Sequence, residues 1–392
     1  MTLDNYVTAS TSRVRSDKDV PRDKFETIKA VAEKRLRETD ATRSKADLNG
    51  VTVELYGNSQ HQQDFWKLNW NPPPPHSSQV DARIYSAYGV ENEEPSAYYC
   101  PETHESVFFN TEYYGQCKSW ALGMAAAILE EKRNTHSIHG ACVDVSGRGV
   151  IIVAPTGTGK TTQAFKLMEL PGGRIVGDDW VYIDHDEGEK LGHLIGRQPE
   201  KSLYMRTETQ MSKPWLRKLF DESKCENITT DKENCEFTQG PVGCKLTHSK
   251  CVFDDGLDSC YYAFGNSRAL VPRERLYGPG KVTDQATIRL LVLLRRDNKS
   301  PPEMHLSAEE AILVLRKGEY MVRPGAGPKE TWGKLANEPW YNPYLLLLDH
   351  AHQEQFFRQM ISKFHVKCLL LNTGVDSIEG THKRIISMLK SS

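Results

Sequence analysis

The sequence of 392 residues lacks long apolar runs and a strong excess of charge of either sign. Nothing in it is long and apolar enough to cross a membrane, and the first residues, MTLDNYVTASTSRVRSD, lack the apolar core of a signal peptide. Because 50 basic residues nearly balance 52 acidic ones, nucleic acid is a poor candidate for the main partner. We therefore expect a cytoplasmic protein that binds neither membrane nor nucleic acid. The oligomeric state is left open.

Closely spaced cysteine pairs are also missing, although the chain has nine cysteines and none of them lies in a C-x-x-C motif. Five fall in a polar segment, about 222–262, that we interpret as an insertion. The successive spacings of 10, 9, 7 and 9 residues are poor for a zinc site, which leaves free thiols, a metal clip or disulfides. These five are Cys225, Cys235, Cys244, Cys251 and Cys260.

The most informative stretch that is present reads VIIVAPTGTGKTT, at 150–162. A β-branched run predicts a buried strand, a glycine-rich turn follows, and residues 163–170 predict a helix. Glycines let backbone N–H groups curl around a phosphate, a lysine reaches the β/γ-phosphates, and a threonine hydroxyl binds Mg²⁺. The strict pattern has glycine where this chain has Ala154, and the alternative is a turn with a solvated lysine. The predicted nucleotide-binding residues are Thr156, Gly157, Thr158, Gly159, Lys160, Thr161 and Thr162.

Two carboxylates and a histidine accompany this loop in the sequence. Asp178 and Asp179 end the apolar stretch RIVG, 18 and 19 residues after Lys160. One carboxylate suits proton acceptance from an attacking hydroxyl, and the other suits metal binding. His139 begins a stretch that we expect to lie beside the strand of the loop. The alternatives are a solvated turn for the aspartates and a structural role for the histidine.

The pattern of elements predicts an α/β protein with three parts: a flexible tail at 1–20, an N-terminal lobe on the substrate side at 21–135, and a P-loop catalytic domain at 136–392. Helices are predicted at 23–39, 120–131 and 307–317, and strands at 287–295 and 366–371. The segment NPPPPHSS, at 71–78, predicts a non-helical connector.

At this point the chain resembles a known superfamily. IHGACVDVSGRGVIIVAPTGTGKTTQAFKL followed by VGDDW resembles the core shared by HPr kinase/phosphorylases and phosphoenolpyruvate carboxykinases. Three further segments resemble carboxykinases in the same order: FNTEYYGQCKSWALG, CVFDDGLDSCYYAFGNSRALVP and CLLLNTGVDSIEGTHKRI. The resemblance implies a divergent member with a mixed-sheet, carboxykinase-like nucleotide-binding core and a divergent N-terminal lobe.

The resemblance also implies roles for particular residues. The first segment carries the Tyr-x-Gly-x-x-Lys pattern, so Tyr113 and Lys118 would contact substrate, with Ser119 where carboxykinases have a second, metal-binding lysine. The second segment would supply a phosphate-binding arginine, Arg268, and the third would place Arg384 near adenine. Glu200, in RQPEKSLYMR, matches a metal-linked glutamate, with Arg206 as the neighbouring cation; the alternative for Glu200 is a surface residue in a loop. The metal ligands would be Thr161, Asp179 and Glu200.

We expect an ATP-dependent kinase that uses Mg²⁺, or Mn²⁺ in its place. By comparison with the HPr kinases, Asp178 would take the acceptor's proton and His139 would assist, while Lys160, Arg268 and Lys118 would complete the catalytic set. The acceptor would be a small anion or a hydroxyl-bearing side chain. The runner-up is a true carboxykinase that makes phosphoenolpyruvate from oxaloacetate with ATP or GTP, and Ser119 counts against it. A nucleotide-binding regulator without catalysis is the third interpretation.

Overall fold

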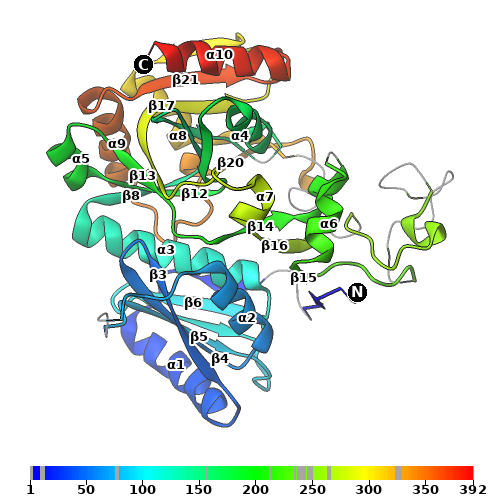
Figure 1. Cartoon of the computed structure of the whole chain (residues 1–392). Coiled ribbons are helices and arrows are strands. Elements are labelled where there is room, and N and C mark those ends of the chain that lie inside the picture. The colour runs from blue at the N-terminus through cyan, green and yellow to red at the C-terminus, as the bar shows by residue number, and fades with distance from the viewer. Residues whose placement is uncertain are drawn as a thin grey trace. The chain divides into compact units, whose positions relative to one another are not determined.

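The computed structural model describes residues 3–8, 14–75, 79–155, 157–211, 213–233, 235, 244, 250–262, 266–322 and 329–391 (Figure 1). The chain forms two compact units. Unit 1 comprises residues 1–121 and 200–276, and unit 2 comprises residues 122–199 and 277–392. This division differs from the predicted one, because residues 200–276 belong with the N-terminal residues rather than with the glycine-rich loop.

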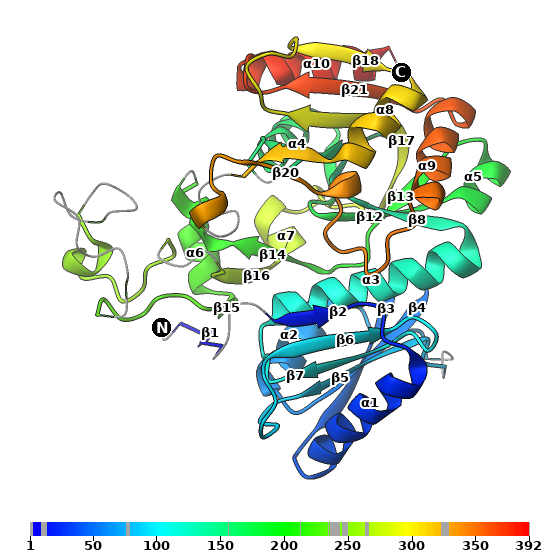
Figure 2. The same cartoon turned by 180° about the vertical axis from the view of Figure 1, so that it is seen from behind.

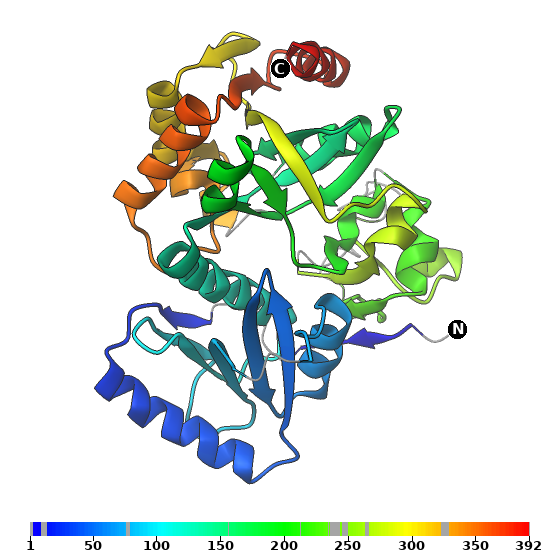
Figure 3. The ribbon, with the colours of Figure 1, turned by 60° about the vertical axis from the view of Figure 1, so that its left-hand side comes forward.

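Unit 1 contains a mixed sheet, drawn in blue to cyan in Figure 3. Its strand order is β2-β6-β7-β5-β4-β3. Its strands are β2 (Arg15–Asp17), β3 (Thr42–Leu48), β4 (Val51–Gly57), β5 (Ala82–Ala87), β6 (Ser96–Cys100) and β7 (Glu105–Phe109). Helix α1 (Arg22–Arg37) lies along one face and buries Phe25, Ala32 and Leu36 against Tyr85 and Val107. The predicted helix at 23–39 is thereby confirmed, and burial of this apolar stripe is what holds it on the sheet.

A second sheet in unit 1 has the order β1-β15-β16-β14. It combines β1 (Asn5–Tyr6), β14 (Ser202–Arg206), β15 (Lys224–Glu226) and β16 (Arg268–Pro272). Helices α2 (Gln60–Asn69), α6 (Leu216–Asp221) and α7 (Arg273–Tyr277) accompany it. Because β15 is an inner strand of this sheet, the segment 222–262 begins inside the fold rather than as a separate insertion.

Residues 3–8 and 14–20, the described part of the predicted flexible tail, contain two paired strands, which corrects that expectation for them; residues 1–2 and 9–13 lie outside the described ones. Strand β1 pairs in parallel with β15, where the backbone N–H groups of Cys225 and Asn227 each donate to β1 and its flank over 2.7 Å. Strand β2 pairs in parallel with β6. Both pairings join residues far apart in sequence, so they leave no periodic pattern in the short segments themselves.

Unit 2 is built on one mixed sheet with the order β11-β9-β10-β17-β13-β12-β8, extended by β21 on β17 and by β18 on β21 (Figure 3). The strands are β8 (Thr135–His139), β9 (Ala141–Val145), β10 (Arg148–Val153), β11 (Gly173–Gly177), β12 (Trp180–Asp184), β13 (Ile195–Arg197), β17 (Gln285–Arg295), β18 (Glu303–Leu306) and β21 (Lys367–Asn372). Strand β17 pairs in parallel with both β10 and β21. The apolar run of β17 is therefore buried among neighbouring strands, as such runs require.

Helices cover both faces of this sheet (Figure 2). On one face, α4 (Lys160–Glu169) and α10 (Ile378–Lys390) pack Leu167 and Ile385 against Val150 and Leu290. On the other face, α8 (Ala308–Lys317) and α9 (His350–Arg358) form a second cluster with Ile151 and Leu291. The unit also contains α5 (His185–Leu191) and the hairpin of β19 (Glu319–Met321) and β20 (Leu335–Asn337).

Most predicted elements agree with the structure. Strands β10, β17 and β21 and helices α4 and α8 lie where the sequence predicts them, to within a few residues at their ends. The helix predicted from 120 begins earlier, as α3 (Tyr114–Arg133), which contributes residues to both units. The connector is non-helical at 72–75, and its residues 76–78 lie outside the described ones. Among the described helices, none has the length and hydropathy needed to cross a membrane.

Candidate functional site

The glycine-rich loop lies between β10 and α4 in unit 2, as the sequence predicts. Gly159 precedes the first turn of α4 with φ 109°, a left-handed value that side chains disfavour. A Cβ built on Gly159 would have no atom of the described residues within 4 Å, so those residues leave room for a ligand there. The first N–H groups of α4 lack partners inside the helix, which makes its N-terminus a suitable place for a phosphate.

The loop is fixed from within and from a neighbouring strand. The buried Thr158 hydroxyl donates to the Pro155 carbonyl over 2.7 Å. The Thr373 hydroxyl, just after β21, donates to the Thr158 carbonyl over 2.9 Å. The Thr158 side chain therefore supports the shape of the loop. Thr156, also predicted to bind nucleotide, lies outside the described residues.

Three of the predicted residues meet at the start of α4. Lys160 Nζ lies 3.1 Å from Asp179 Oδ1 and 3.3 Å from His139 Nε2. His139 Nε2 is itself 3.0 Å from the same carboxylate oxygen. All three side chains are mostly buried, with 13%, 16% and 27% exposed for His139, Lys160 and Asp179. Residues separated by up to 40 positions thus form one charged group beside the loop.

The hydrogen bonds around His139 define which nitrogen carries its proton. Nδ1 lies 2.6 Å from the Tyr341 carbonyl, which can only accept, so Nδ1–H is the donor. Nε2 faces both the Lys160 ammonium, which can only donate, and the Asp179 carboxylate, which can only accept, so its own role depends on which of the two it bonds. The strand that contains His139 also differs from the predicted one. His139 ends β8, which pairs with β12, while β9 is the strand beside that of the loop.

Tyr344 is a member of this group that the sequence did not reveal. Its hydroxyl donates to Asp179 Oδ2 over 2.8 Å, and its ring lies 5.3 Å from the ring of His139. Just before it, Trp340 and Tyr341 both have positive φ, 62° and 51°. Two consecutive bulky residues in this region are costly and occur mainly where the fold holds them for function. The turn presents the Tyr341 carbonyl to His139.

A glycine of α3 makes room for that turn. A Cβ on Gly123 would collide with the carbonyl oxygen of Tyr344 and with the side chain of Leu346. The close approach therefore requires glycine at this position. The aromatic, proline-containing sequence PWYNPY at 339–344 is the one signal that could have drawn attention to the turn.

The remaining predicted residues of unit 2 have less defined surroundings. Asp178 follows β11 and is half-buried. Thr161 is half-buried and Thr162 exposed on the first turn of α4. Arg384 lies on α10 between two carboxylates, 2.9 Å from Asp376 and 2.6 Å from Glu303. Their roles toward nucleotide and metal stay predictions.

In unit 1, Lys118 and Glu200 form a buried ion pair. Lys118 Nζ lies 3.2 Å from Glu200 Oε1, and the Asn69 side-chain amide donates to the same oxygen over 3.1 Å. Lys118 is 5% exposed and Glu200 3% exposed. The alternative of a surface residue is therefore wrong for Glu200. The pair is of the kind that costs much to break once buried, and its role in metal binding stays a prediction.

Other predicted residues of unit 1 gather around Tyr204 and Glu226. The guanidinium of the buried Arg268 lies 5.6 Å from the centre of the Tyr204 ring, and the ring of Tyr113 lies 6.4 Å from it. The Tyr204 hydroxyl donates to the Glu226 carboxylate, and burial raises the pKa of Tyr204 well above its usual value. Two predicted substrate residues have local partners instead. Arg206 pairs with Glu208 over 3.4 Å, and the Ser119 hydroxyl donates to the Gln116 carbonyl over 3.0 Å.

The cysteines of segment 222–262 show no metal-binding arrangement in the part of the chain that the structure describes. Cys225 and Cys251 are buried free thiols. Burial raises the pKa of Cys225 to about 12, which leaves it protonated and unreactive at neutral pH. For these two residues the structure supports the free-thiol alternative.

Unit 2 has the architecture of an α/β nucleotide-binding fold: a mixed sheet, helices on both faces, and a glycine-rich turn that opens onto a helix.

Part of the chain is similar in sequence to curated proteins that are each an HPr kinase/phosphorylase. The proteins of Bacillus licheniformis and Bacillus subtilis are 42% and 39% identical over 66 residues. That of Brevibacillus brevis is 41% identical over 80 residues. No protein-family model matches the chain.

These similarities are confined to a short segment. It amounts to 17% of this chain and 20% of the relative from Bacillus licheniformis, and to 20% and 24% for that from Brevibacillus brevis. The chain therefore spans about a fifth of the length of the curated relatives that it matches. The predicted resemblance to HPr kinase/phosphorylases is confirmed for that segment, and the resemblance to carboxykinases stays a prediction.

Proposed function

We propose that this chain is an ATP-dependent phosphotransferase that uses Mg²⁺ and transfers the γ-phosphoryl group to a hydroxyl-bearing acceptor. The observation that carries the proposal is the convergence of Lys160, His139 and Asp179 at the end of a glycine-rich loop. A cation, a histidine and a carboxylate gathered beside a phosphate-binding loop are groups that phosphoryl transfer to a hydroxyl uses. The kinase name of the relatives supports the same reaction class.

The loop has the features that a triphosphate needs. Gly157 and Gly159 both have positive φ, and the described residues leave open the space at the Cβ position of Gly159. Backbone N–H groups at the start of α4 would bind the phosphates, and Lys160 would exchange its carboxylate partner for a phosphate oxygen. The internal hydrogen bonds of Thr158 hold the loop in shape before the nucleotide arrives, which lowers the entropy cost of binding.

The two aspartates would divide the chemistry. The acceptor oxygen forms a bond to the γ-phosphorus while the bond to the β,γ-bridging oxygen breaks, and ADP leaves. Asp178 would take the proton of the acceptor. Asp179 and the Thr161 hydroxyl would hold Mg²⁺, which offsets negative charge on the phosphates when it is bound. Tyr344 and His139 would orient the Asp179 carboxylate through the contacts they already make.

HPr, the protein in the name of the relatives, is the first acceptor to test. The assay supplies full-length protein with ATP, Mg²⁺ and HPr, and mass spectrometry measures the mass gain of one phosphoryl group. A panel of hydroxyl-bearing metabolites and proteins follows in the same format. We expect ADP and a phosphorylated acceptor in equal amounts.

Two variants decide whether the proposed residues are responsible. Asp178→Asn removes the proton acceptor with little change in size. Asp186→Asn, an exposed aspartate at the start of α5, is the matched control. Loss of phosphorylation in the first variant alone supports the proposal. Equal rates in both variants and the wild type would contradict the role of Asp178, and ATP binding without transfer to any acceptor would favour the regulator.

A further inference from the structure

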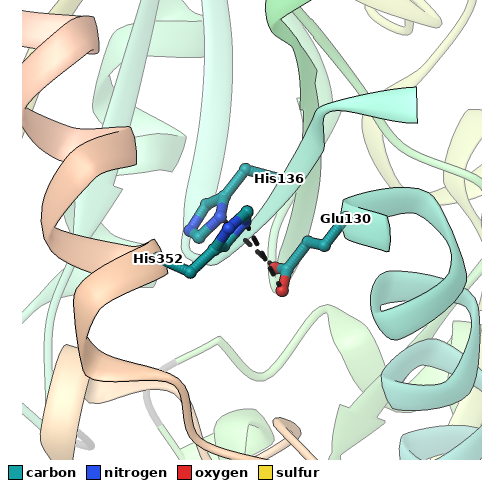
Figure 4. A group of neighbouring side chains, drawn as sticks. All are labelled: Glu130, His136 and His352. Carbon is teal, nitrogen blue, oxygen red and sulfur yellow. Dashed lines mark ion pairs between the residues drawn. The ribbon is translucent and has the colours of Figure 1, made fainter. Parts of the chain in front are cut away.

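A second polar group lies in unit 2 and shares no residue with the proposed kinase site. Glu130 near the end of α3, His136 in β8 and His352 in the first turn of α9 turn their side chains toward one another (Figure 4). Their positions in the sequence differ by up to 222 residues, so the group exists only in the folded chain. No local pattern in the sequence predicts it.

The distances within the group match those between ligands of one metal ion. Glu130 Oε1 lies 3.3 Å from His136 Nδ1, and Glu130 Oε2 lies 3.9 Å from His352 Nε2. One potential ligand atom from each residue lies within 4.8 Å of the other two. Tetrahedral Zn²⁺, with bonds of about 2.0–2.2 Å to nitrogen and oxygen, separates its ligand atoms by about 3.3–3.5 Å. The Glu130–His136 separation fits directly, and His352 needs a shift of about an ångström.

The protein satisfies the hydrogen-bonding capacity of the group only in part. Among the described residues, neither ring nitrogen of the buried His136 has a hydrogen-bond partner of normal geometry, and neither has Glu130 Oε1. His136 is 1% exposed, so solvent does not serve these atoms freely. Buried polar atoms without partners are costly and call for an explanation such as an ion. The Glu130 carboxylate also accepts from the backbone N–H of Ser137, and the side chain of Gln353 interacts with both Glu130 and His136.

The ring of His136 is held in place while one side of the group stays accessible. Phe356 stacks on His136 with ring centres 3.4 Å apart, and Phe357 meets it edge-on at 5.8 Å. The His352 side chain is 34% exposed. A fixed ligand on the inside and a movable one at the surface give an ion a path into the group.

We propose that Glu130, His136 and His352 form a binding site for a divalent transition metal ion, with Zn²⁺ as the best fit. Two imidazoles and one carboxylate are ligands that Zn²⁺ favours, and water would complete the coordination. Mg²⁺ and Ca²⁺ prefer oxygen ligands, so the ion of the proposed kinase reaction would not compete here. The metal would cross-link α3, β8 and α9.

The charge state of the group agrees with this proposal. Burial, helped by the nearby His352 and His185, lowers the pKa of His136 well below its usual value. An imidazole binds a metal in its neutral form. Burial, with Asp349 nearby, also raises the pKa of Glu130 to about 7. A bound cation would supply the positive charge that this buried carboxylate lacks.

The test uses the full chain, stripped of metal with a chelator and free of nucleotide. Equilibrium dialysis against Zn²⁺ should give one ion per chain. X-ray absorption at the zinc edge should show nitrogen and oxygen neighbours without sulfur. His352→Gln should weaken Zn²⁺ binding at least about tenfold, because losing even a residue that only hydrogen-bonds a metal ligand weakens metal binding by about that much. This variant changes a half-exposed side chain, so it should fold.

Two controls separate this site from others. His305→Gln removes an exposed histidine that pairs with Glu303 over 2.9 Å but has no third ligand in the described part of the chain, and it should leave binding unchanged. Asp179→Asn alters the proposed kinase site and should also leave Zn²⁺ binding unchanged. Three results would each overturn the proposal. They are sulfur ligands in the absorption spectrum, equal Zn²⁺ binding by His352→Gln and the wild type, and loss of the ion in Asp179→Asn. None of these results bears on phosphoryl transfer.

Discussion

Replacing Lys160 by alanine separates the two roles that this lysine could have, in the fold and in catalysis. Its ammonium lies 3.1 Å from Asp179, and the two side chains are 16% and 27% exposed. At an effective dielectric constant of about 20 the gross attraction is about 5 kcal/mol, but desolvation and side-chain entropy offset most of it. Asp179 also keeps its hydrogen bond from Tyr344. We therefore expect Lys160→Ala to change the free energy of unfolding by about 1 kcal/mol or less.

The expected effect on function is much larger. A cation that stabilises the transferred phosphoryl group contributes about 10³-fold or more to the rate, or about 4 kcal/mol. We expect ATP binding, measured by titration calorimetry, to weaken at least about tenfold, which corresponds to about 1.4 kcal/mol. This assay needs no acceptor. Denaturant unfolding of the same samples measures stability.

The matched control is Lys166→Ala on the same helix. Lys166 also forms an ion pair, with Glu379, but that partner is 65% exposed. We expect this variant to bind ATP like the wild type and to lose no more stability than Lys160→Ala does. If both variants bind ATP equally well, or both lose it equally, the assignment of Lys160 to the phosphates is refuted.

Three further predictions follow from the same structure. Asp178→Asn should lower kcat by about 10²- to 10⁴-fold, whereas Asp179→Asn should mainly raise the Mg²⁺ concentration needed for activity. Steady-state kinetics over a range of Mg²⁺ concentrations measures both effects. If both variants keep wild-type rates, the two aspartates have only a structural role. Oxaloacetate with ATP or GTP and Mn²⁺ should give negligible phosphoenolpyruvate, because Ser119 is a poor metal ligand; robust Mn²⁺-dependent product would reverse the ranking of the two enzymes. Burial lowers the pKa of His185 from its ordinary 6.5 to about 4, so the unfolded chain binds a proton first as the pH falls. The wild type should thus lose about 2 kcal/mol more stability than His185→Gln between pH 7 and 4.5, measured by urea unfolding, and equal losses would contradict the neutral buried state.

The glycine-rich loop could be predicted from sequence because its signals are local. A β-branched run, glycines at set spacing and a helical pattern follow one another within about twenty residues, and each arises from backbone geometry. The aspartates after β11 could be found for the same reason, since they end an apolar strand near the loop in sequence. The position of His139 relative to these motifs predicts its place in the site, although the predicted strand is wrong, because His139 ends β8 and β9 is the strand beside that of the loop.

The features that the sequence did not reveal depend on contacts between distant segments. Tyr344 reaches Asp179 across 165 positions, and the turn before it has positive φ at residues other than glycine, which no composition rule predicts. Strands β1 and β2 are too short for periodicity and form by pairing with β15 and β6. The same long-range pairing places residues 200–276 in unit 1.

Transfer of labelled phosphate tests the central claim most directly. The full chain is incubated with Mg²⁺, ATP labelled at the γ-phosphate and either HPr or a fractionated mixture of proteins and metabolites. The wild type should move the label to one acceptor with release of unlabelled ADP, and Lys160→Ala should not. Tight ATP binding by the wild type with the label retained on ATP in every fraction would contradict the account and identify the chain as a nucleotide-binding regulator.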